Sequence, residues 1–212
     1  MHPFTPLLRL FFRLLYHQFA WAYDLVAAVV SLGRWKGWVL SALPYVDGRV
    51  LEIGYGPGHL QVALHERGLA AFGLDESPQM ARQARRGLLR RSLPANLARG
   101  HAPHLPFPAN TFDTLVATFP AEFIFDAQTL AETRRVLVPG GRLVILPTAW
   151  ITGKGWLERL AAWLFKVSGE AGALGTLLPG MRKRLRAAGF EVRHELVEYP
   201  GSRVLVIVAG KR

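Results

Sequence analysis

Three glycines and an acidic residue form the part of the sequence whose spacing is suited to ligand binding. Gly54, Gly56 and Gly58 directly follow an apolar run of strand length, and Asp75 ends the next such run. Glycines after a buried strand let the backbone turn sharply and approach a ligand closely at a helix start. A carboxylate at the neighbouring strand end can accept hydrogen bonds from both hydroxyls of a ribose. The pattern predicts a site for a ribose-containing cofactor; the alternatives are a loop that serves packing alone and an aspartate that caps the helix near Ser77.

The residue after this loop separates two cofactor classes. A dinucleotide-binding GxGxxG motif would place a further glycine where this chain has His59. Because that glycine permits close packing of the helix near the pyrophosphate, its absence disfavours NAD. An adenosyl sulfonium carries no phosphate, so it needs backbone room and ribose acceptors but no phosphate-binding lysine.

Strands and helices alternate from residue 49 onward and must position these groups. Apolar runs predict strands over 49–53, 70–75, 96–99, 111–119 and 142–147, helices over 59–67, 77–91 and 128–137, and a terminal antiparallel pair over 190–199 and 203–209. Such alternation is typical of βαβ units on a parallel sheet. The expected fold class is α/β: a Rossmann-like, seven-stranded, mostly parallel sheet with an antiparallel C-terminal hairpin, helices on both faces and an N-terminal helical extension.

Length and composition predict a single packed domain. The chain has 212 residues, of which 50% are hydrophobic and 19% are charged. That is enough for one core and too little for two ordinary domains. We expect one domain over 1–212, with a helical cap over 1–45 and a helical insertion over 150–185 that forms a lid over the substrate. The sequence holds no cysteine, which excludes disulfides, thiolate metal sites and cysteine nucleophiles.

Several segments, in order along the chain, carry a family resemblance. They are Tyr23-Asp24, VLEIGYGPGH at 50–59, Asp75, GHAPHLPF at 100–107, FDTLVATFP at 112–120 and RVLVPGGRLVI at 135–145. They resemble segments of class I methyltransferases. In the same order, these are the N-terminal tyrosine–aspartate pair, the first motif, the acidic end of the second strand, the adenine-lining segment, the fourth strand and the helix-turn-strand near the fifth strand. The likeness is to the small members that act on quinones, lipids and similar metabolites. It implies S-adenosylmethionine as cofactor and methyl transfer as reaction.

The resemblance also implies roles for individual residues. Glu52 and the glycine loop would surround the methionine half of the cofactor, and Asp75 would hold its ribose. Ala102 would lie near the adenine, Phe119 beneath the sulfonium, and Tyr23 over the cofactor. The full set of expected cofactor-binding residues is Tyr23, Glu52, Gly54, Tyr55, Gly56, Gly58, Asp75, Glu76, His101, Ala102 and Phe119. His101 stands where the family usually has an aspartate, so it would accept a hydrogen bond from the adenine amino group only through an unprotonated ring nitrogen.

Methyl transfer needs little from the protein beyond alignment and exclusion of water, because the sulfur is already positively charged. Glu122, just beyond the predicted fourth strand, is the candidate base if the acceptor must lose a proton. A solvent-facing loop position is the alternative that we favour for Glu122. His101 and His104 are interleaved with prolines and lack nearby carboxylates in the sequence, so we expect no metal site.

Two aromatic-rich amphipathic segments indicate a hydrophobic acceptor. On a helix, Trp156, Leu160, Trp163 and Val167 would share an apolar stripe, which favours either ordinary packing onto the sheet or a lid or membrane-facing helix. Residues 7–30 form the second segment, and polar residues interrupt it, so no stretch of about 18 residues is apolar enough for a membrane span. The expected acceptor is a quinone, a lipid or a similar metabolite.

The charge of the chain favours anionic partners. The formal net charge is +11, from 26 lysines and arginines against 15 acidic residues. Arginines cluster at 82–91, and basic residues cluster again at 182–186; solvated helix faces are the usual explanation, with anionic lipid or nucleic acid as alternatives. Thr118-Phe119-Pro120-Ala121 replaces the Asn/Asp-Pro-Pro-Tyr signature of nucleic-acid amino-methyltransferases, which disfavours RNA and DNA. A non-catalytic cofactor-binding or membrane-docking protein is the remaining alternative. We expect a cytoplasmic protein, with peripheral contact to an anionic membrane left open.

Overall fold

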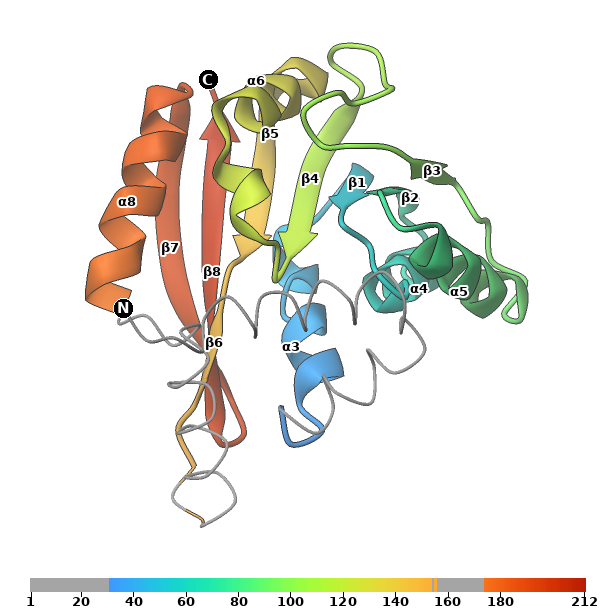
Figure 1. The fold of residues 1–212 in the computed structure, drawn as a ribbon, viewed down its shortest axis with the longest axis horizontal. Coiled ribbons are helices and arrows are strands. Elements are labelled where there is room, and N and C mark those ends of the chain that lie inside the picture. Colours follow the sequence, from blue (N-terminus) through green and yellow to red (C-terminus); the bar gives the residue numbers. More distant parts are fainter. Residues whose placement is uncertain (1–30, 154, 156–173) are drawn as a thin grey trace, which may run out of the picture.

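A mixed β-sheet forms the centre of the protein (Figure 1). The computed structural model describes residues 31–153, 155 and 174–212. In this part of the chain the sheet has eight strands: β1 (Arg49–Ile53), β2 (Ala70–Asp75), β3 (Leu97–Arg99), β4 (Phe112–Thr118), β5 (Leu137–Leu146), β6 (Ala149–Ile151), β7 (Phe190–Tyr199) and β8 (Ser202–Lys211). The order is β3-β2-β1-β4-β5-β8-β6, with β7 also on β8. Strands β1 to β5 pair in parallel, and β8 is antiparallel to its neighbours.

Strand β6 was not predicted, and its pairing explains how it fits the expected sheet. Strand β7 pairs with β8 from end to end, whereas β5 pairs with residues 207–210 of β8 and β6 with residues 202–204. Since a strand has two edges, β5 and β6 lie end to end along the same edge of β8. The predicted fold class is therefore confirmed, and β6 continues the fifth strand beyond the break at Pro147 and Thr148.

Strand β5 begins earlier than predicted. The sequence placed its start at Arg142, after Pro139-Gly140-Gly141, but Leu137 already pairs with Phe112 of β4. The register then shifts between Phe112 and Thr114. An added Cβ at Gly141 would lie 2.9 Å from the carbonyl oxygen of Val138, so only glycine fits this irregularity. Gly140 and Gly141 thus bend strand β5, whereas the sequence predicted that they lie between the preceding helix and the strand.

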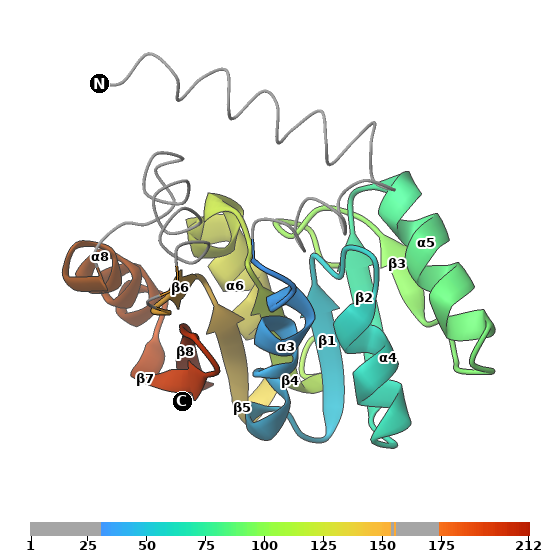
Figure 2. The ribbon, with the colours of Figure 1, turned by 90° about the horizontal axis from the view of Figure 1, so that it is seen from below.

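Helices cover both faces of the sheet (Figure 2). They are α3 (Trp35–Leu40), α4 (His59–Glu66), α5 (Pro78–Leu89), α6 (Ala127–Val136) and α8 (Leu174–Ala187), with short 3-10 turns η1 (Leu43–Tyr45) and η2 (Glu122–Phe125). Of the expected N-terminal cap, α3 and η1 belong to the described residues, whereas Tyr23 and the Trp156–Val167 stripe lie outside them. None of the described helices has both the length and the apolar content to cross a bilayer.

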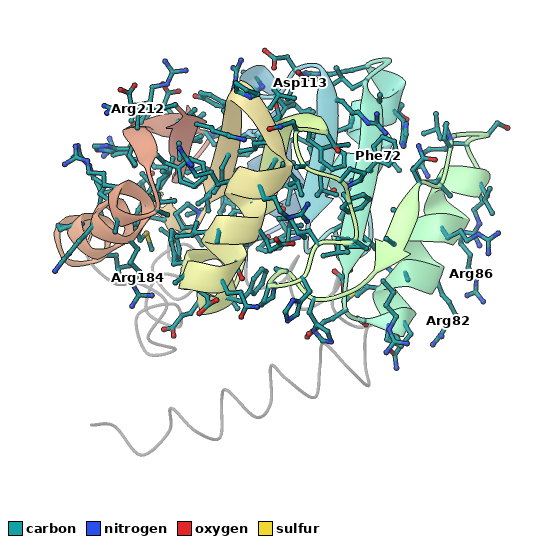
Figure 3. The ribbon with its side chains drawn as sticks, turned by 90° about the horizontal axis from the view of Figure 1, so that it is seen from above. Phe72, Arg82, Arg86, Asp113, Arg184 and Arg212 are labelled. Carbon is teal, nitrogen blue, oxygen red and sulfur yellow. The ribbon has the colours of Figure 1, made fainter. Side chains whose placement is uncertain are left out.

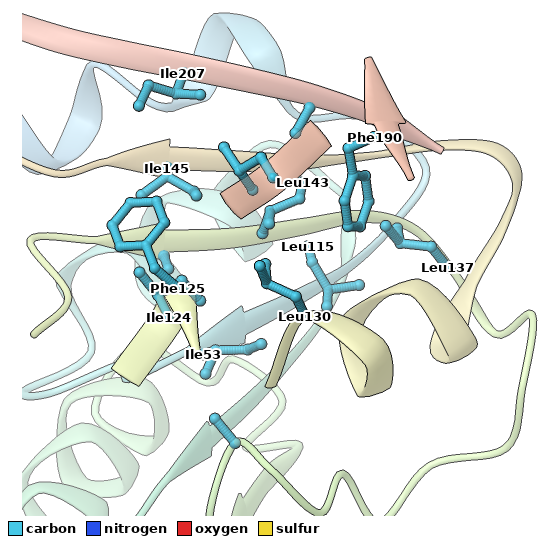
Figure 4. Close-up of a cluster of buried hydrophobic side chains, with 14 of the residues drawn as sticks. Ile53, Leu115, Ile124, Phe125, Leu130, Leu137, Leu143, Ile145, Phe190 and Ile207 are labelled. Carbon is cyan, nitrogen blue, oxygen red and sulfur yellow. The ribbon is translucent and has the colours of Figure 1, made fainter. Parts of the chain in front are cut away.

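Alternation along the strands divides the core between the two faces. Leu115 of β4 packs in one cluster with Leu130 of α6, and Figure 4 shows this cluster between the sheet and the helix. The next residue, Val116, packs on the opposite face with Trp38 of α3. Both strand residues are fully buried, as expected for parallel strands with helices on each side.

Helix α5 shows how local sequence signals set an element that leads from the site. Ser77 is its N-cap and accepts a hydrogen bond from the amide of Met80 at 3.3 Å, and Pro78 occupies the first helical position. Met80 faces the core, whereas Arg82 and Arg86 point away from the sheet (Figure 3). The predicted helix start is confirmed.

A buried hydrogen bond fastens α3 to the C-terminal strand. The indole Nε1 of Trp38 donates to Ser202 Oγ at 2.8 Å, and both side chains are almost completely buried. We expect Trp38→Phe and Ser202→Ala each to lower the free energy of unfolding by about 1–3 kcal/mol, because each leaves a buried polar group unsatisfied. The double variant should lose less than the sum, since it removes both partners. Urea denaturation of the four proteins measures this coupling, and additive losses would contradict it.

Candidate active site

The loop between β1 and α4 holds three glycines in the left-handed region, with φ of +75° at Gly54, +51° at Gly56 and +87° at Gly58. An added Cβ at Gly58 would lie 2.8 Å from the Cβ of Ala84 in α5, so this glycine serves helix packing. At Gly56 nothing lies within 4 Å of the added atom, and at Gly54 the nearest atom is Phe123 Cζ at 3.8 Å. Gly54 and Gly56 therefore present backbone to open space, where a ligand can approach.

Asp75 fixes this loop to the end of β2. Its Oδ2 accepts a hydrogen bond from the amide of Gly56 at 2.9 Å, and its Oδ1 accepts one from the amide of Ser77 at 2.8 Å. The residue is only 2% exposed. Each carboxylate oxygen can accept more than one hydrogen bond, so ribose hydroxyls remain compatible with this arrangement. Asp75 thus orders the loop, while Ser77 caps the following helix.

Glu52 of β1 is a second buried carboxyl group at the same edge of the sheet. Gln61 of α4 donates from Nε2 to Glu52 Oε2 at 2.9 Å and to the carbonyl oxygen of Phe72 at 3.1 Å. Burial, supplemented by the charge of Asp75, raises the pKa of Glu52 to about 8, although the hydrogen bond from Gln61 opposes the shift. The charge of Asp75 beside the buried Glu52 makes this edge receptive to a cation.

Tyr55 fills the space beneath the loop. Its ring lies so close to β2 that an added Cβ at Gly73 would be 2.6 Å from Tyr55 Cδ1. The side chain is 3% exposed, and its hydroxyl has no hydrogen-bond partner among the described residues. Burial and the nearby carboxyls of Asp75 and Glu52 raise its pKa. The described contacts give Tyr55 a packing role, and its predicted contact with the cofactor stays a prediction.

Glu76 and His101 meet at the outer rim beside Asp75. His101 Nδ1 lies 3.2 Å from Glu76 Oε2, and both side chains are largely exposed. Ala102, the next residue, is buried in the core cluster that includes Leu105. The structure thus brings Glu76 and His101 together at the ends of β2 and β3, next to the loop.

Phe119 occupies a different position from the rest of the predicted set. It follows β4 with φ of +49°, a conformation that a bulky residue rarely adopts. Its ring centroid lies 4.6 Å from that of Trp35 and 6.2 Å from that of Trp38, so the ring packs on the α3 side of the sheet. Its expected place beneath the sulfonium stays a prediction.

Two residues that the sequence did not single out belong to this site: Gln61 and Phe123. Phe123 is 37% exposed on η2, a turn that buried Ile124 and Phe125 anchor to the core. Glu122, the candidate base, is exposed on the same turn. The sequence offered one signal, the polar Gln61 beside the apolar Leu60 and Leu64 of α4, and none for Phe123.

The residues present fit an adenosyl sulfonium better than a dinucleotide. The carboxylate of Asp75, joined by that of Glu52 once Glu52 is ionised, lies against the loop, where it attracts an ammonium or sulfonium and repels a pyrophosphate. Open space beside Gly54 and Gly56 provides the room for close approach. As for metals, no group of three or more histidines, aspartates and glutamates gathers in ligating positions within the described ranges.

Comparisons with known proteins agree with this geometry. Residues 51–145 match the family model described as a methyltransferase domain. The demethylmenaquinone methyltransferase of Deinococcus radiodurans is 34% identical over 205 residues, covering 84% of this chain and 83% of that protein. The one from Thermus thermophilus is 32% identical over 209 residues, covering 87% and 95%. A solved methyltransferase from Thermotoga maritima superimposes with a TM-score of 0.60 at 24% identity, covering 92% of this chain and 97% of that one.

The fold and the site define a Rossmann-like domain that binds an adenosyl cofactor at the carboxyl ends of its parallel strands. The chain belongs to the class I S-adenosylmethionine-dependent methyltransferases. It is an enzyme, and S-adenosylmethionine is its methyl donor.

The buried Glu52 predicts an unusual pH dependence of stability. Its folded pKa of about 8 exceeds the ordinary value of 4.5, so its contribution is full below pH 4.5 and is lost as the pH rises towards 8. Each pH unit in that window lowers the free energy of unfolding by at most about 1.4 kcal/mol. In Glu52→Gln, which can still accept the Gln61 hydrogen bond, this decline should disappear.

Urea denaturation of the cofactor-free protein between pH 5 and 8 tests the prediction. The exposed Glu195 provides a matched control, because Glu195→Gln makes the same chemical change outside the core. Glu195→Gln should decline like the parent protein. An equal decline in Glu52→Gln would rule out Glu52 as the titrating group.

Proposed function

We propose that the enzyme methylates a quinone-type ring that carries an apolar substituent. The observation that carries this proposal is the similarity, at 34% and 32% identity over most of both chains, to two enzymes named demethylmenaquinone methyltransferases. The acceptor in this proposal is the reduced, hydroquinone form of a demethylated ring, because its carbon is electron-rich enough to act as nucleophile.

The cofactor supplies a methyl group on a positively charged sulfur. The ring carbon forms a bond to that methyl carbon, the carbon–sulfur bond breaks, and the ring carbon's proton leaves to solvent or to a base, giving S-adenosylhomocysteine and the methylated hydroquinone. Alignment of the two reactants is the main demand on the protein. Glu122 lies at the exposed start of η2 and is the candidate to take up the proton.

Individual residues have distinct parts in this proposal. Glu52 holds the ammonium of the methionine half, and backbone groups at Gly54 and Gly56 contact its carboxylate end. Asp75 holds the ribose while its bonds to Gly56 and Ser77 keep the loop in place. Glu76, His101 and Ala102 border the adenine, and Tyr55 and Gly58 support the loop from beneath. Tyr23 and Phe119 keep the roles expected from the resemblance.

Phe123 provides a flat surface for the acceptor ring. It is an exposed aromatic side chain on an anchored turn, and its Cζ lies 3.8 Å from the Cβ position of Gly54. Aromatic rings stack in offset or edge-to-face geometry with about 0.5–1.5 kcal/mol of stabilisation beyond area burial. A quinone ring stacked on Phe123 would lie directly beside the loop that binds the methyl donor.

Basic helix faces support peripheral contact with an anionic membrane, where an apolar quinone would reside. Helix α5 carries Arg82 and Arg86 on its outer face, and α8 carries Arg184. In Figure 3 Arg184 lies at one end of the molecule and Arg82 and Arg86 at the other, all lower in the view than Asp113. Near an anionic surface each basic residue contributes about 1 kcal/mol of attraction.

A methyl-transfer assay tests the acceptor. The protein with radiolabelled S-adenosylmethionine should transfer label to a reduced demethylated naphthoquinone with a short isoprenoid chain, and should transfer none to RNA. Gly56→Ala should lower the rate at least tenfold, because its added methyl group points into the open space beside the loop. The left-handed φ of +51° costs an alanine about 1–2 kcal/mol, so thermal unfolding of this variant confirms that it is folded. Label in RNA alone, or in no fraction, would contradict the proposal.

Membrane contact is tested with the hydroquinone presented in vesicles with and without phosphatidylglycerol. If the basic helix faces contact an anionic membrane, turnover should be faster with the anionic lipid.

Replacement of Phe123 tests the stacking surface. Phe123→Ala should raise the KM for the hydroquinone by up to about tenfold, because a stacking contact is worth about 1.5 kcal/mol at most. The KM for S-adenosylmethionine should stay within about twofold of the parent value. Leu89, 55% exposed at the end of α5, gives a matched control, and Leu89→Ala should change neither constant. Unchanged hydroquinone kinetics in Phe123→Ala would place the ring elsewhere.

A further inference from the structure

A cavity lies apart from the cofactor site, between α6 and α8. Its volume is about 760 Å³, within the roughly 300–1,000 Å³ typical of sites for small ligands. Asn110 and Lys211, which line it, stand beside the amino-terminal starts of β4 and β5, since Lys211 donates to Asn110 Oδ1 and to the carbonyl oxygen of Leu137. The glycine loop lies at the opposite, carboxyl edge of the sheet.

The cavity exists because small side chains face one another across the two helices. Ala127 and Ala131 are one turn apart on α6, and Ala187 and Ala188 close the end of α8. Leu130, part of the core cluster in Figure 4, forms the floor. The helices leave a groove because alanines do not fill the space between them, and its lining is suited to an apolar chain.

Positive charge surrounds this apolar floor. Arg134, Arg184 and Lys211 line the cavity, and none of the described lining residues is an aspartate or a glutamate. A fourth cation in the lining, Arg135, already forms an ion pair, because Glu132 accepts hydrogen bonds from its Nε at 2.6 Å and from its Nη2 at 2.8 Å. The nearby Glu191 is likewise paired with Arg212. The remaining cations therefore have no side-chain carboxylate to compensate them among the described residues that line the cavity.

Arg134 shows most clearly that a partner is needed. Its buried Nε has no hydrogen-bond acceptor among the described residues, and its Nη2 reaches only the backbone oxygen of Arg212 at 3.5 Å. Burial and the charge of Arg134 lower the pKa of Lys211. Basic residues in the last turn of a helix are expected from the helix dipole. The dipole does not account for a buried guanidinium nitrogen without an acceptor, which costs free energy. An anion in the groove that accepted from the other nitrogens of Arg134 would offset part of that cost.

We propose that the α6–α8 groove binds a phosphate-bearing amphiphile, an anionic phospholipid whose phosphate meets Arg134, Arg184 and Lys211 while its chain lies along the alanines and Leu130. A guanidinium and an ammonium together match the charge of a phosphate ester, and the apolar floor selects a ligand with a hydrocarbon tail. The site is independent of methyl transfer, because it shares no residue with the cofactor loop.

Calorimetry with the full chain tests the proposal. The probes are dihexanoyl phosphatidic acid as soluble monomer, dihexanoyl phosphatidylcholine and inorganic phosphate. The parent protein should bind one phosphatidic acid, with phosphate at least tenfold weaker and phosphatidylcholine weaker still. Arg134→Ala and Lys211→Ala should each weaken phosphatidic acid about tenfold or more, as expected for loss of a charge-assisted hydrogen bond. Arg193→Ala, on the exposed face of β7, is the matched control and should not change the affinity.

A variant that leaves the charge intact tests the apolar part of the site. Ala131 is exposed in the groove, so Ala131→Leu should fold normally, fill the space for the chain and weaken phosphatidic acid while leaving phosphate unchanged. Thermal unfolding midpoints confirm that each variant is folded. Absence of one-to-one binding, an equal loss in Arg193→Ala, or an unaffected Ala131→Leu would each overturn the proposal. Phosphate that binds as tightly as phosphatidic acid would overturn the lipid as the source of the phosphate group.

Discussion

The two hydrogen bonds to the carboxylate of Asp75 are the interaction on which the cofactor site depends. They join the amide of Gly56 in one loop to the amide of Ser77 in the next, across the ends of β1 and β2. Buried bonds to a charged acceptor are worth more than neutral ones. A loop whose glycines allow many conformations is therefore held in one, with its open side towards the space beside Gly54 and Gly56. The same residue that orders the loop is the one for which we propose a contact with the ribose.

This arrangement has an electrostatic cost that a cationic cofactor bound there would offset. Glu52 and Asp75 are both buried, and the charge of Asp75 contributes to the raised pKa of Glu52. A neutral Glu52 is the stable form without a cation, because ionisation in a buried site is unfavourable. An ammonium and a sulfonium at this edge favour its ionised form. Burial makes two ionised carboxyls unfavourable when no ligand is bound. The same burial therefore suits the site to a cationic cofactor.

Much of the fold was predictable from sequence, because its signals are local. Alternating apolar runs placed the strands β1 to β4, and Ser77-Pro78 placed the start of α5. The early start of β5 was not predictable, because Leu137 is in the strand only through its pairing with Phe112 of a different segment. The sequence also placed Asp75 at the end of the second strand, and there it bonds to Gly56 of the glycine loop. Phe123 was not identified, since its proximity to Gly54 arises from how η2 packs onto the core and leaves no trace in residue spacing.

The strongly positive chain and the acidic cofactor site are compatible because they act over different distances. The net charge of +11 sets the long-range field, which solvent ions screen over about 8 Å at physiological ionic strength. Glu52 and Asp75 act within a buried site, where the local dielectric is lower and nearby charges dominate. Arg134, Arg184 and Lys211 gather instead around the groove at the other edge of the sheet. Local groups, and not the overall charge of the protein, therefore favour a cationic ligand at the carboxyl edge of the sheet and an anionic ligand at the opposite edge.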